Sequence, residues 1–273
     1  MITKTELIKI CSAFTEAQSI VKCERIINGF SNHNFLIRTE QQSYLLKCYK
    51  SHWPNIGLEA QRFLSGFSVC PAPIWLDKVN QHAAFNYIEG DVAQSHISSI
   101  PRSLINKLVQ VHNYDIKTEP MDIAKELFCY QQSLVYKQYQ PQIEAALKVI
   151  SRMSFDEGFC HNDLVKENII VNATGMYLID FEYAKTNDVY FDLASLAVSF
   201  NLSEHSESIL LADYKKCISG EFKFTQSIDK LNNYKLLYLV LCVGWYEQRA
   251  ISNKSVELRA QLDDLISQNK IKP

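Results

Sequence analysis

The spacing of hydrophobic and polar residues gives the first third of the chain the pattern of a β-sheet and the remainder the pattern of helices. Apolar residues recur at helical intervals over residues 1–20 and 55–67. Runs of β-forming residues bounded by turn residues predict strands, at 23–30, 34–39, 44–49 and 83–88. After residue 90 helical patterns predominate, at about 101–113, 122–150, 190–201, 206–219, 228–250 and 254–268.

This change of pattern near residues 86–91 predicts two lobes joined by a short link. We expect an N-lobe of residues 1–88 and a C-lobe of residues 89–273. The fold class is therefore predicted to be α+β, with a β-rich N-lobe and a mainly helical C-lobe.

One segment interrupts the helical part of the chain, and it carries polar residues in a distinctive order. Residues 159–183 read FCHNDLVKENIIVNATGMYLIDFEY. Strand patterns at 169–171 and 176–179, separated by a glycine turn, predict a hairpin. Such a hairpin would bring Asp180, after the second strand, back beside Asn168, before the first.

The side chains of this segment match the chemistry of phosphoryl transfer from a nucleotide. A carboxylate must orient an attacking hydroxyl and accept its proton, and we assign this catalytic role to Asp163. Oxygen ligands must hold magnesium on the phosphates, and Asn168 and Asp180 could supply them. His161, also placed in the catalytic set, is interpreted as organising the loop rather than as the base. Each residue alone fits a turn, a cap or a strand end, but the ordered set favours a site.

The predicted N-lobe contains candidates for a nucleotide site. A turn between its first two strands could donate backbone N–H groups and side chains to phosphate oxygens, although most such turns are only hairpins. The backbone of the link between the lobes could hydrogen-bond an adenine. The candidate residues of the turn and the link are Gly29, Ser31, Asn32, Asn86, Tyr87 and Ile88.

A lysine in an apolar strand of the same lobe is a further nucleotide-binding candidate. Lys47 is flanked by Leu46 and Cys48, so its charge needs a partner if it is buried. Glu59, on the predicted helix that follows, could hold Lys47 on the α- and β-phosphates. The alternative is an edge-strand lysine that points into water.

Together these residues resemble the aminoglycoside phosphotransferase and choline kinase superfamily, which shares its fold with protein kinases. The resemblance runs from about Ile26 to about Arg249 and is most specific in HNDLVKENIIV…LIDFEYA…NDVYFDLASLA. It implies a bilobal kinase-like fold and ATP and Mg²⁺ as cofactors. It also implies Asp163 as the base, Asn168 and Asp180 as metal ligands, Lys47 on phosphate, and Asp192 as a structural brace of the catalytic loop.

Within this superfamily the chain is most similar to bacterial choline kinases and thiamine kinases, which implies a small, cationic alcohol as acceptor. Aromatic faces and acidic groups favour such cations. The resemblance assigns Tyr183, Glu182, Trp245 and Tyr246 to the acceptor, although aromatic residues on an apolar helix are more often core residues. Thiamine, amino-sugar or aminoglycoside kinases remain alternatives, as does a nucleotide-binding module without activity.

Composition and charge argue against several other classes of function. The formal net charge is −2, so nucleic acid and anionic membranes are not expected partners. The longest apolar stretch, 236–246, is too short to cross a bilayer, and the start lacks the pattern of a signal peptide. The eight cysteines form no CxxC pair, which favours a reduced, cytoplasmic protein without zinc. The sequence leaves the oligomeric state open.

Overall fold

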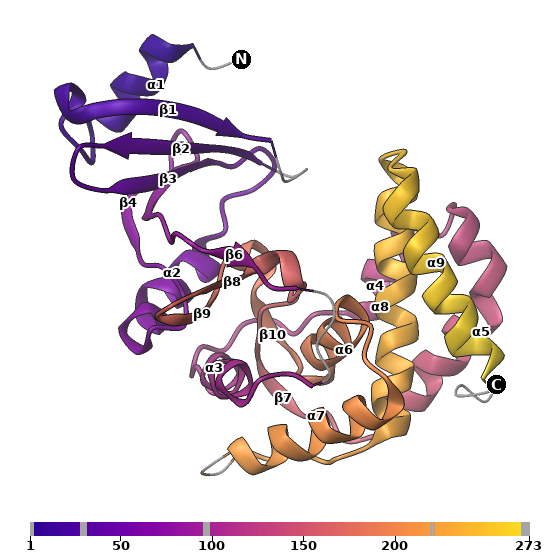
Figure 1. The fold of residues 1–273 in the computed structure, drawn as a ribbon. Helices are drawn as coiled ribbons and strands as arrows, with labels where there is room; N and C mark the ends of the chain where they lie inside the picture. Colours follow the sequence, from indigo (N-terminus) through magenta and orange to yellow (C-terminus); the bar gives the residue numbers. More distant parts are fainter. Residues whose placement is uncertain (1–2, 28–31, 95–98, 219, 221, 269–273) are drawn as a thin grey trace. The chain divides into compact units, whose positions relative to one another are not determined.

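The computed structural model describes residues 3–27, 32–94, 99–218, 220 and 222–268 (Figure 1). The chain forms two compact units. Unit 1 comprises residues 1–91 and 170–182, and unit 2 comprises residues 92–169 and 183–273. The lobes predicted from the sequence were 1–88 and 89–273, whereas the folded chain leaves unit 1 after Asp91 and returns to it for part of the motif segment.

Unit 1 is built on a five-stranded antiparallel sheet with the strand order β1-β2-β3-β5-β4 (Figure 1). Its strands are β1 (Ile20–Ile26), β2 (His33–Thr39), β3 (Ser43–Cys48), β4 (Pro73–Asp77) and β5 (His82–Asn86). The predicted strands are confirmed with shifts of a few residues. β4 follows the Pro71–Pro73 break and completes the sheet.

Two helices cover different faces of this sheet because successive side chains of a strand alternate between faces. From α1 (Lys4–Cys11), Leu7 packs in one core cluster with Tyr44 and Leu46 of β3. From α2 (Asn55–Leu64), Leu58 lies in a second cluster, against which Leu45 packs. By this alternation Lys47 lies on the same face as Leu45.

The helix predicted over residues 1–20 is shorter than expected. A capping box between Thr3 and Glu6 starts α1, and the helix ends at Cys11. A short 3₁₀ turn, Ala17–Ser19, follows, and β1 begins at Ile20, so the apolar residues near position 20 belong to the sheet.

The predicted motif hairpin is confirmed as β8 (Ile169–Asn172) and β9 (Gly175–Leu178), which form a small sheet in the order β6-β8-β9 with β6 (Asp91–Val92). Within unit 1, α2 approaches the end of this segment very closely. A Cβ atom built at Gly57 would lie 2.0 Å from the carbonyl oxygen of Phe181. Only glycine fits here, one residue away from Asp180 along the motif.

Unit 2 is mainly helical, and its longest helix, α8 (Ile228–Gln248), packs against α5, α6 and α9 (Figure 1). The other helices are α3 (Arg102–His112), α4 (Ile123–Phe128), α5 (Leu134–Ile150), α6 (Tyr190–Ser199), α7 (Glu204–Cys217) and α9 (Ser252–Ser267). Together with the sheet of unit 1, these helices confirm the predicted α+β fold class.

Two features of unit 2 differ from the sequence prediction. The single helix expected over 122–150 is two helices, because Ser133 caps the start of α5 after a non-helical turn. An additional two-stranded antiparallel sheet pairs β7 (Glu157–Cys160) with β10 (Lys185–Asp188). The sequence of β10, Lys-Thr-Asn-Asp, lacks the apolar alternation that predicts a strand.

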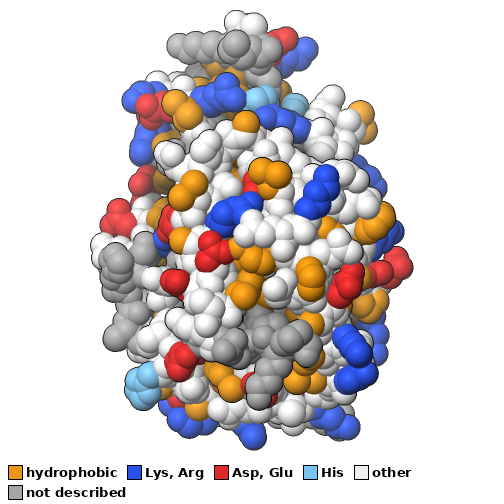
Figure 2. Space-filling model, turned by 90° about the vertical axis from the view of Figure 1, so that its right-hand side faces the viewer, with side chains coloured by type: hydrophobic (Ala, Val, Ile, Leu, Met, Phe, Trp, Pro, Cys, Tyr) orange, Lys and Arg blue, Asp and Glu red, His pale blue; other side chains and the backbone are white. Residues whose placement is uncertain are grey.

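The surface is of mixed charge. On the face drawn in Figure 2, basic and acidic side chains lie among one another and among scattered hydrophobic ones, with no large patch of one sign among the coloured residues. Within the described ranges, no helix combines the length and the apolar character needed to cross a bilayer. All eight cysteines are free thiols.

Candidate active site

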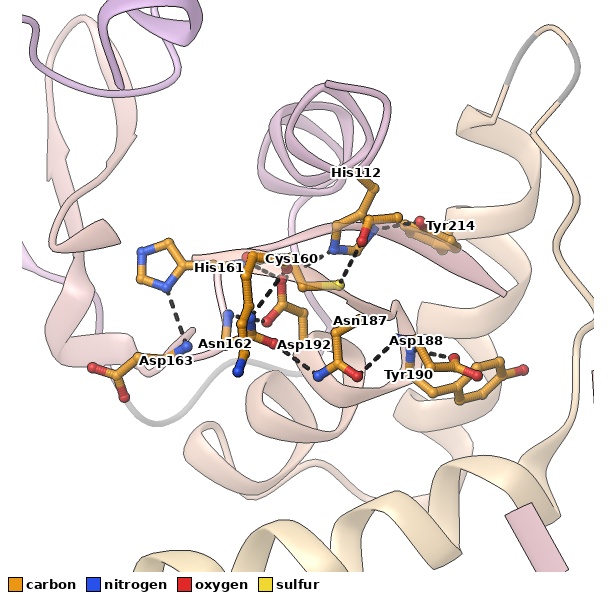
Figure 3. A network of polar contacts seen from close by, with 12 residues as sticks. His112, Cys160, His161, Asn162, Asp163, Asn187, Asp188, Tyr190, Asp192 and Tyr214 are labelled. Carbon is orange, nitrogen blue, oxygen red and sulfur yellow. Dashed lines mark hydrogen bonds and ion pairs between the residues drawn. The ribbon is translucent and has the colours of Figure 1, made fainter. Parts of the chain in front are cut away.

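The catalytic loop of unit 2 follows β7 and is fixed by a buried carboxylate on α6 (Figure 3). Asp192 is fully buried. Its Oδ2 atom accepts the backbone N–H of His161 at 2.8 Å, and its Oδ1 atom accepts that of Asn162 at 2.8 Å. Charge-assisted hydrogen bonds of this kind fix the backbone immediately before Asp163.

His161 lies inside the protein and takes part in the loop structure. Its side chain is fully buried, and its Nδ1 atom accepts the backbone N–H of Asp163 at 3.3 Å (Figure 3). This burial and this contact fit a residue that organises the loop. The structure therefore places His161 among the positioning residues and leaves Asp163 as the candidate base.

Asn168 contacts Asp163 directly. A 3₁₀ turn, Lys166–Asn168, turns the chain back, and the Asn168 amide nitrogen donates to the Asp163 backbone oxygen at 2.9 Å and to its Oδ2 atom at 3.0 Å. The nitrogen makes both bonds, so the amide oxygen is the atom that suits a hard cation such as Mg²⁺. The Asp163 carboxylate is held in place by the same contact.

In unit 1, Lys47 lies against two carboxylates of the motif segment. Its ammonium group donates to Oδ1 of Asp180 and lies 3.7 Å from Oε2 of Glu182. The Lys47 side chain is 6% exposed and that of Glu182 5%, so these charges compensate each other away from water. Glu182 also accepts a hydrogen bond from the Asn32 amide at 2.5 Å.

These contacts correct one prediction and reassign another. Glu59 is exposed on α2 and forms no ion pair with Lys47, because the buried face of that helix is made by other positions. The partner of Lys47 is instead Glu182, together with Asp180. Glu182 was predicted to face the acceptor, but its carboxylate is already engaged by Lys47 and Asn32.

Only some of the remaining nucleotide-binding candidates lie among the described residues. Gly29 and Ser31 lie outside the described residues, whereas Asn32 is buried and its Oδ1 atom accepts the backbone N–H of Lys50 at 3.3 Å. The link residues Asn86, Tyr87 and Ile88 follow the end of β5. The N–H of Tyr87 already donates to the carbonyl of Ser43 at 3.0 Å, so it would not serve an adenine.

On one face of α8, three residues have pKa values to which the charge of Asp163 contributes. Tyr238, Cys242 and Tyr246 are four residues apart and so share a face. Burial raises the pKa of Cys242 and of Tyr246 to about 12, and the Asp163 charge contributes to both shifts. Burial also raises the pKa of Tyr238 well above its usual range, with contributions from the charges of Cys242 and Asp163. Cys242 was not predicted as a site residue, although the four-residue spacing was a signal.

The other acceptor candidates have different surroundings. The guanidinium carbon of Arg249 lies 3.8 Å from the ring centroid of Trp245, so one face of this ring already holds a cation. Nearby on the same helix, Glu247 forms a 2.5 Å ion pair with Arg259 of α9. Tyr183 follows Glu182 and is 41% exposed. Tyr246 also lines an open cavity of about 530 Å³.

Comparison with known proteins identifies the family. A model of the phosphotransferase enzyme family matches residues 22–216. The chain belongs to this phosphotransferase family. The resemblance predicted from the motif is thereby confirmed, and the catalytic loop, Lys47, Asp180 and Asp192 all lie within the matched range.

Relatives of this phosphotransferase come from several bacteria. A Mycoplasma capricolum protein named LicA homolog is 25% identical over 200 residues, which cover 70% of the chain and 78% of the relative. A Haemophilus influenzae protein named LicA is 26% identical over 211 residues, covering 69% of the chain but only 61% of the relative. The crystal structure of choline kinase LicA from Streptococcus pneumoniae aligns with a TM-score of 0.79 at 20% identity, covering 97% of the chain and 100% of that structure.

Proposed function

We propose that this phosphotransferase transfers the γ-phosphoryl group of MgATP to the hydroxyl of choline or a related amino alcohol. The observation that carries the proposal is the carboxylate of Asp163, which the Asn168 amide holds at 3.0 Å and whose charge contributes to the raised pKa of Tyr238 and Tyr246 on α8. A base beside aromatic rings suits an acceptor that combines a hydroxyl with a cationic group. The Streptococcus pneumoniae protein of similar fold is named a choline kinase, which agrees with this acceptor class.

In the proposed reaction, Asp163 acts on the acceptor, and Lys47, Asp180 and Asn168 act on the phosphates and the metal ion. The acceptor hydroxyl donates its hydrogen bond to Asp163, its oxygen attacks the γ-phosphorus, and its proton passes to the Asp163 carboxylate as the bond to the β-phosphate oxygen breaks. Lys47, held by Glu182, binds the phosphates and offsets their charge. Asp180 and the amide oxygen of Asn168 are the donor types that Mg²⁺ prefers. When bound, the ion would neutralise charge that develops on the phosphate oxygens.

A screen of acceptors with labelled ATP tests the proposal. Choline, ethanolamine, thiamine, an amino sugar and an aminoglycoside would be compared by kcat/KM under the same conditions. We expect choline or ethanolamine to give the highest value. A higher kcat/KM for thiamine or an aminoglycoside would mean that this compound, and not an amino alcohol, is the acceptor. ATP binding without turnover of any of these compounds would mean that the chain is a nucleotide-binding module.

The assignment of Glu182 as the partner of Lys47 predicts that substitution of Glu182, but not of Glu59, weakens the use of ATP. Glu182→Gln removes the charge beside Lys47 and is expected to raise the KM for ATP about tenfold, the scale of a hydrogen bond to a charged group. Glu59→Gln is the matched control and should leave this KM unchanged, because Glu59 is exposed and not paired with Lys47. Equal effects of the two variants would contradict the assignment.

A cation bound by aromatic rings of α8 predicts a selective loss of acceptor affinity. Trp245→Ala is expected to raise the KM for the acceptor about tenfold while the KM for ATP stays unchanged. Steady-state kinetics with each substrate varied in turn would measure both constants. Tyr246→Ala is the companion variant. If only Tyr246→Ala raised the acceptor KM, Trp245 would not contact the acceptor, and its ring would serve only the contact with Arg249.

A further inference from the structure

Asn162, between the two catalytic-set residues, has an unusual backbone conformation and an unusually rich set of contacts. Its φ of 62° lies in the left-handed region, which glycine occupies freely and other residues seldom adopt. Asparagine is among the few side chains that tolerate this region, because it can hydrogen-bond locally. Asparagine can therefore adopt this backbone conformation while its side-chain amide forms hydrogen bonds to neighbouring segments.

The Asn162 amide connects the catalytic loop to the segment that carries Tyr183. Its Nδ2 atom donates to the carbonyl oxygens of Tyr183 at 3.0 Å and Lys185 at 3.2 Å, and more weakly to that of Cys160 at 3.4 Å. Its Oδ1 atom accepts a hydrogen bond from Asn187 at 2.8 Å (Figure 3). One side chain thus ties the residue before Asp163 to residues 183–187.

The far end of this connection is firmly anchored. Asn187 is 2% exposed, and its Oδ1 atom accepts the backbone N–H of Asp188 at 2.8 Å. Asp188 forms a 2.6 Å ion pair with Lys230 of α8, and both side chains are almost fully buried. Asn162 therefore spans two rigid supports, since its own N–H is held by Asp192. Movement of segment 183–187 relative to the loop would break these bonds.

We propose that Asn162 is a positioning residue that sets the distance between Asp163 and the acceptor-contacting segment at Tyr183. The proposal rests on the proposed function and on the assignment of Tyr183 to the acceptor that the family resemblance implies. The hydrogen bonds of the Asn162 amide hold the Tyr183 backbone at a fixed place relative to the base. Without them the loop keeps its brace from Asp192, but the acceptor hydroxyl is presented to Asp163 less accurately.

The test uses two variants that keep the left-handed backbone accessible. Asn162→Gly removes the whole amide, and Asn162→Asp keeps an acceptor for Asn187 but cannot donate to the two carbonyls. Asn201→Gly is the matched control, because Asn201 is also an asparagine with positive φ, 48°, in unit 2. Each full-length variant would be assayed for acceptor KM and kcat, for MgATP affinity, and for hydrogen exchange of peptides covering residues 183–188.

Both Asn162 variants are expected to lower kcat/KM for the acceptor about tenfold to a hundredfold, the scale of two lost hydrogen bonds. MgATP affinity should change less than about threefold, and exchange in 183–188 should accelerate about tenfold. Asn201→Gly should behave as wild type. Unchanged exchange in this segment, or a kcat/KM for the acceptor within about threefold of wild type, would overturn the proposal.

The exchange measurement also separates this proposal from the proposed function. If wild-type protein phosphorylates no amino alcohol, the acceptor assignment fails, and the kinetic arm is run with whichever acceptor the screen identifies. Faster exchange of 183–188 in both Asn162 variants would still support the positioning role. Wild-type exchange in those variants would overturn it whatever the acceptor.

Discussion

Asp163→Ala is expected to reduce kcat on the order of a thousandfold, with little change in the affinity for MgATP. The physical reason is that the carboxylate acts on the attacking hydroxyl, and general-base groups contribute about a hundredfold to ten-thousandfold. The measurement pairs single-turnover kinetics with a direct ATP titration. Asp163 belongs to unit 2, whereas Lys47 and Asp180, assigned to the phosphates and the metal, belong to unit 1.

Asp163→Asn is the informative companion to this variant. An asparagine side chain still offers an oxygen to the Asn168 amide, so the contact seen at 3.0 Å can persist while the base is lost. Both variants should be equally inactive because both lack the base, and Asp163→Asn should keep a thermal stability close to that of wild type. Proportional losses of ATP affinity and turnover would mean that Asp163 binds nucleotide, and the assigned role would be wrong.

The second large effect concerns the close contact between α2 and the motif segment. Gly57→Ala is expected to lower the free energy of unfolding by about 3 kcal/mol, because the new Cβ would lie 2.0 Å from the Phe181 carbonyl oxygen, a backbone atom that cannot move aside cheaply. This corresponds to a fall in melting temperature of roughly 6–12 °C. Turnover should fall as well, because Phe181 follows Asp180 directly.

Gly66→Ala provides the control for this substitution. Gly66 lies in the 3₁₀ turn that follows α2, and a Cβ at this position meets nothing within 4 Å. The change should be neutral or stabilise the protein by about 0.5 kcal/mol, because alanine restricts the unfolded chain. If Gly66→Ala were as damaging as Gly57→Ala, the loss would reflect a general effect of replacing a glycine in this region and not the contact with Phe181.

Much of the fold could be predicted because its elements have strong local patterns. The alternation over 34–39 and 44–49 became β2 and β3, and the long apolar period over 228–250 became α8. The sheet of β7 and β10 could not be predicted this way. Its strands have four residues each. In β10, Thr186, Asn187 and Asp188 are buried in polar contacts, so this strand has no apolar alternation that a sequence pattern could reveal.

The site was predictable to the extent that its residues follow one another along the chain. The motif from His161 to Asp180 was found because a loop and a hairpin fix its spacing. The partner of Lys47 could not be chosen in the same way, because an ion pair depends on which carboxylate shares a buried face with the lysine. Glu59 lies nearer to Lys47 in the sequence. Glu182, 135 positions after Lys47, is the glutamate whose side chain is buried beside it.

The return of residues 170–182 to unit 1 has a consequence for dissecting the protein. A fragment that ends at residue 91 would lack Asp180 and Glu182, the carboxylates that accompany the Lys47 ammonium group. An uncompensated cation in that interior is costly, so the fragment would swell, or admit water, around β3. A single cut therefore cannot release unit 1 as an autonomous module, and a minimal version would need residues 170–182 joined to the truncated chain.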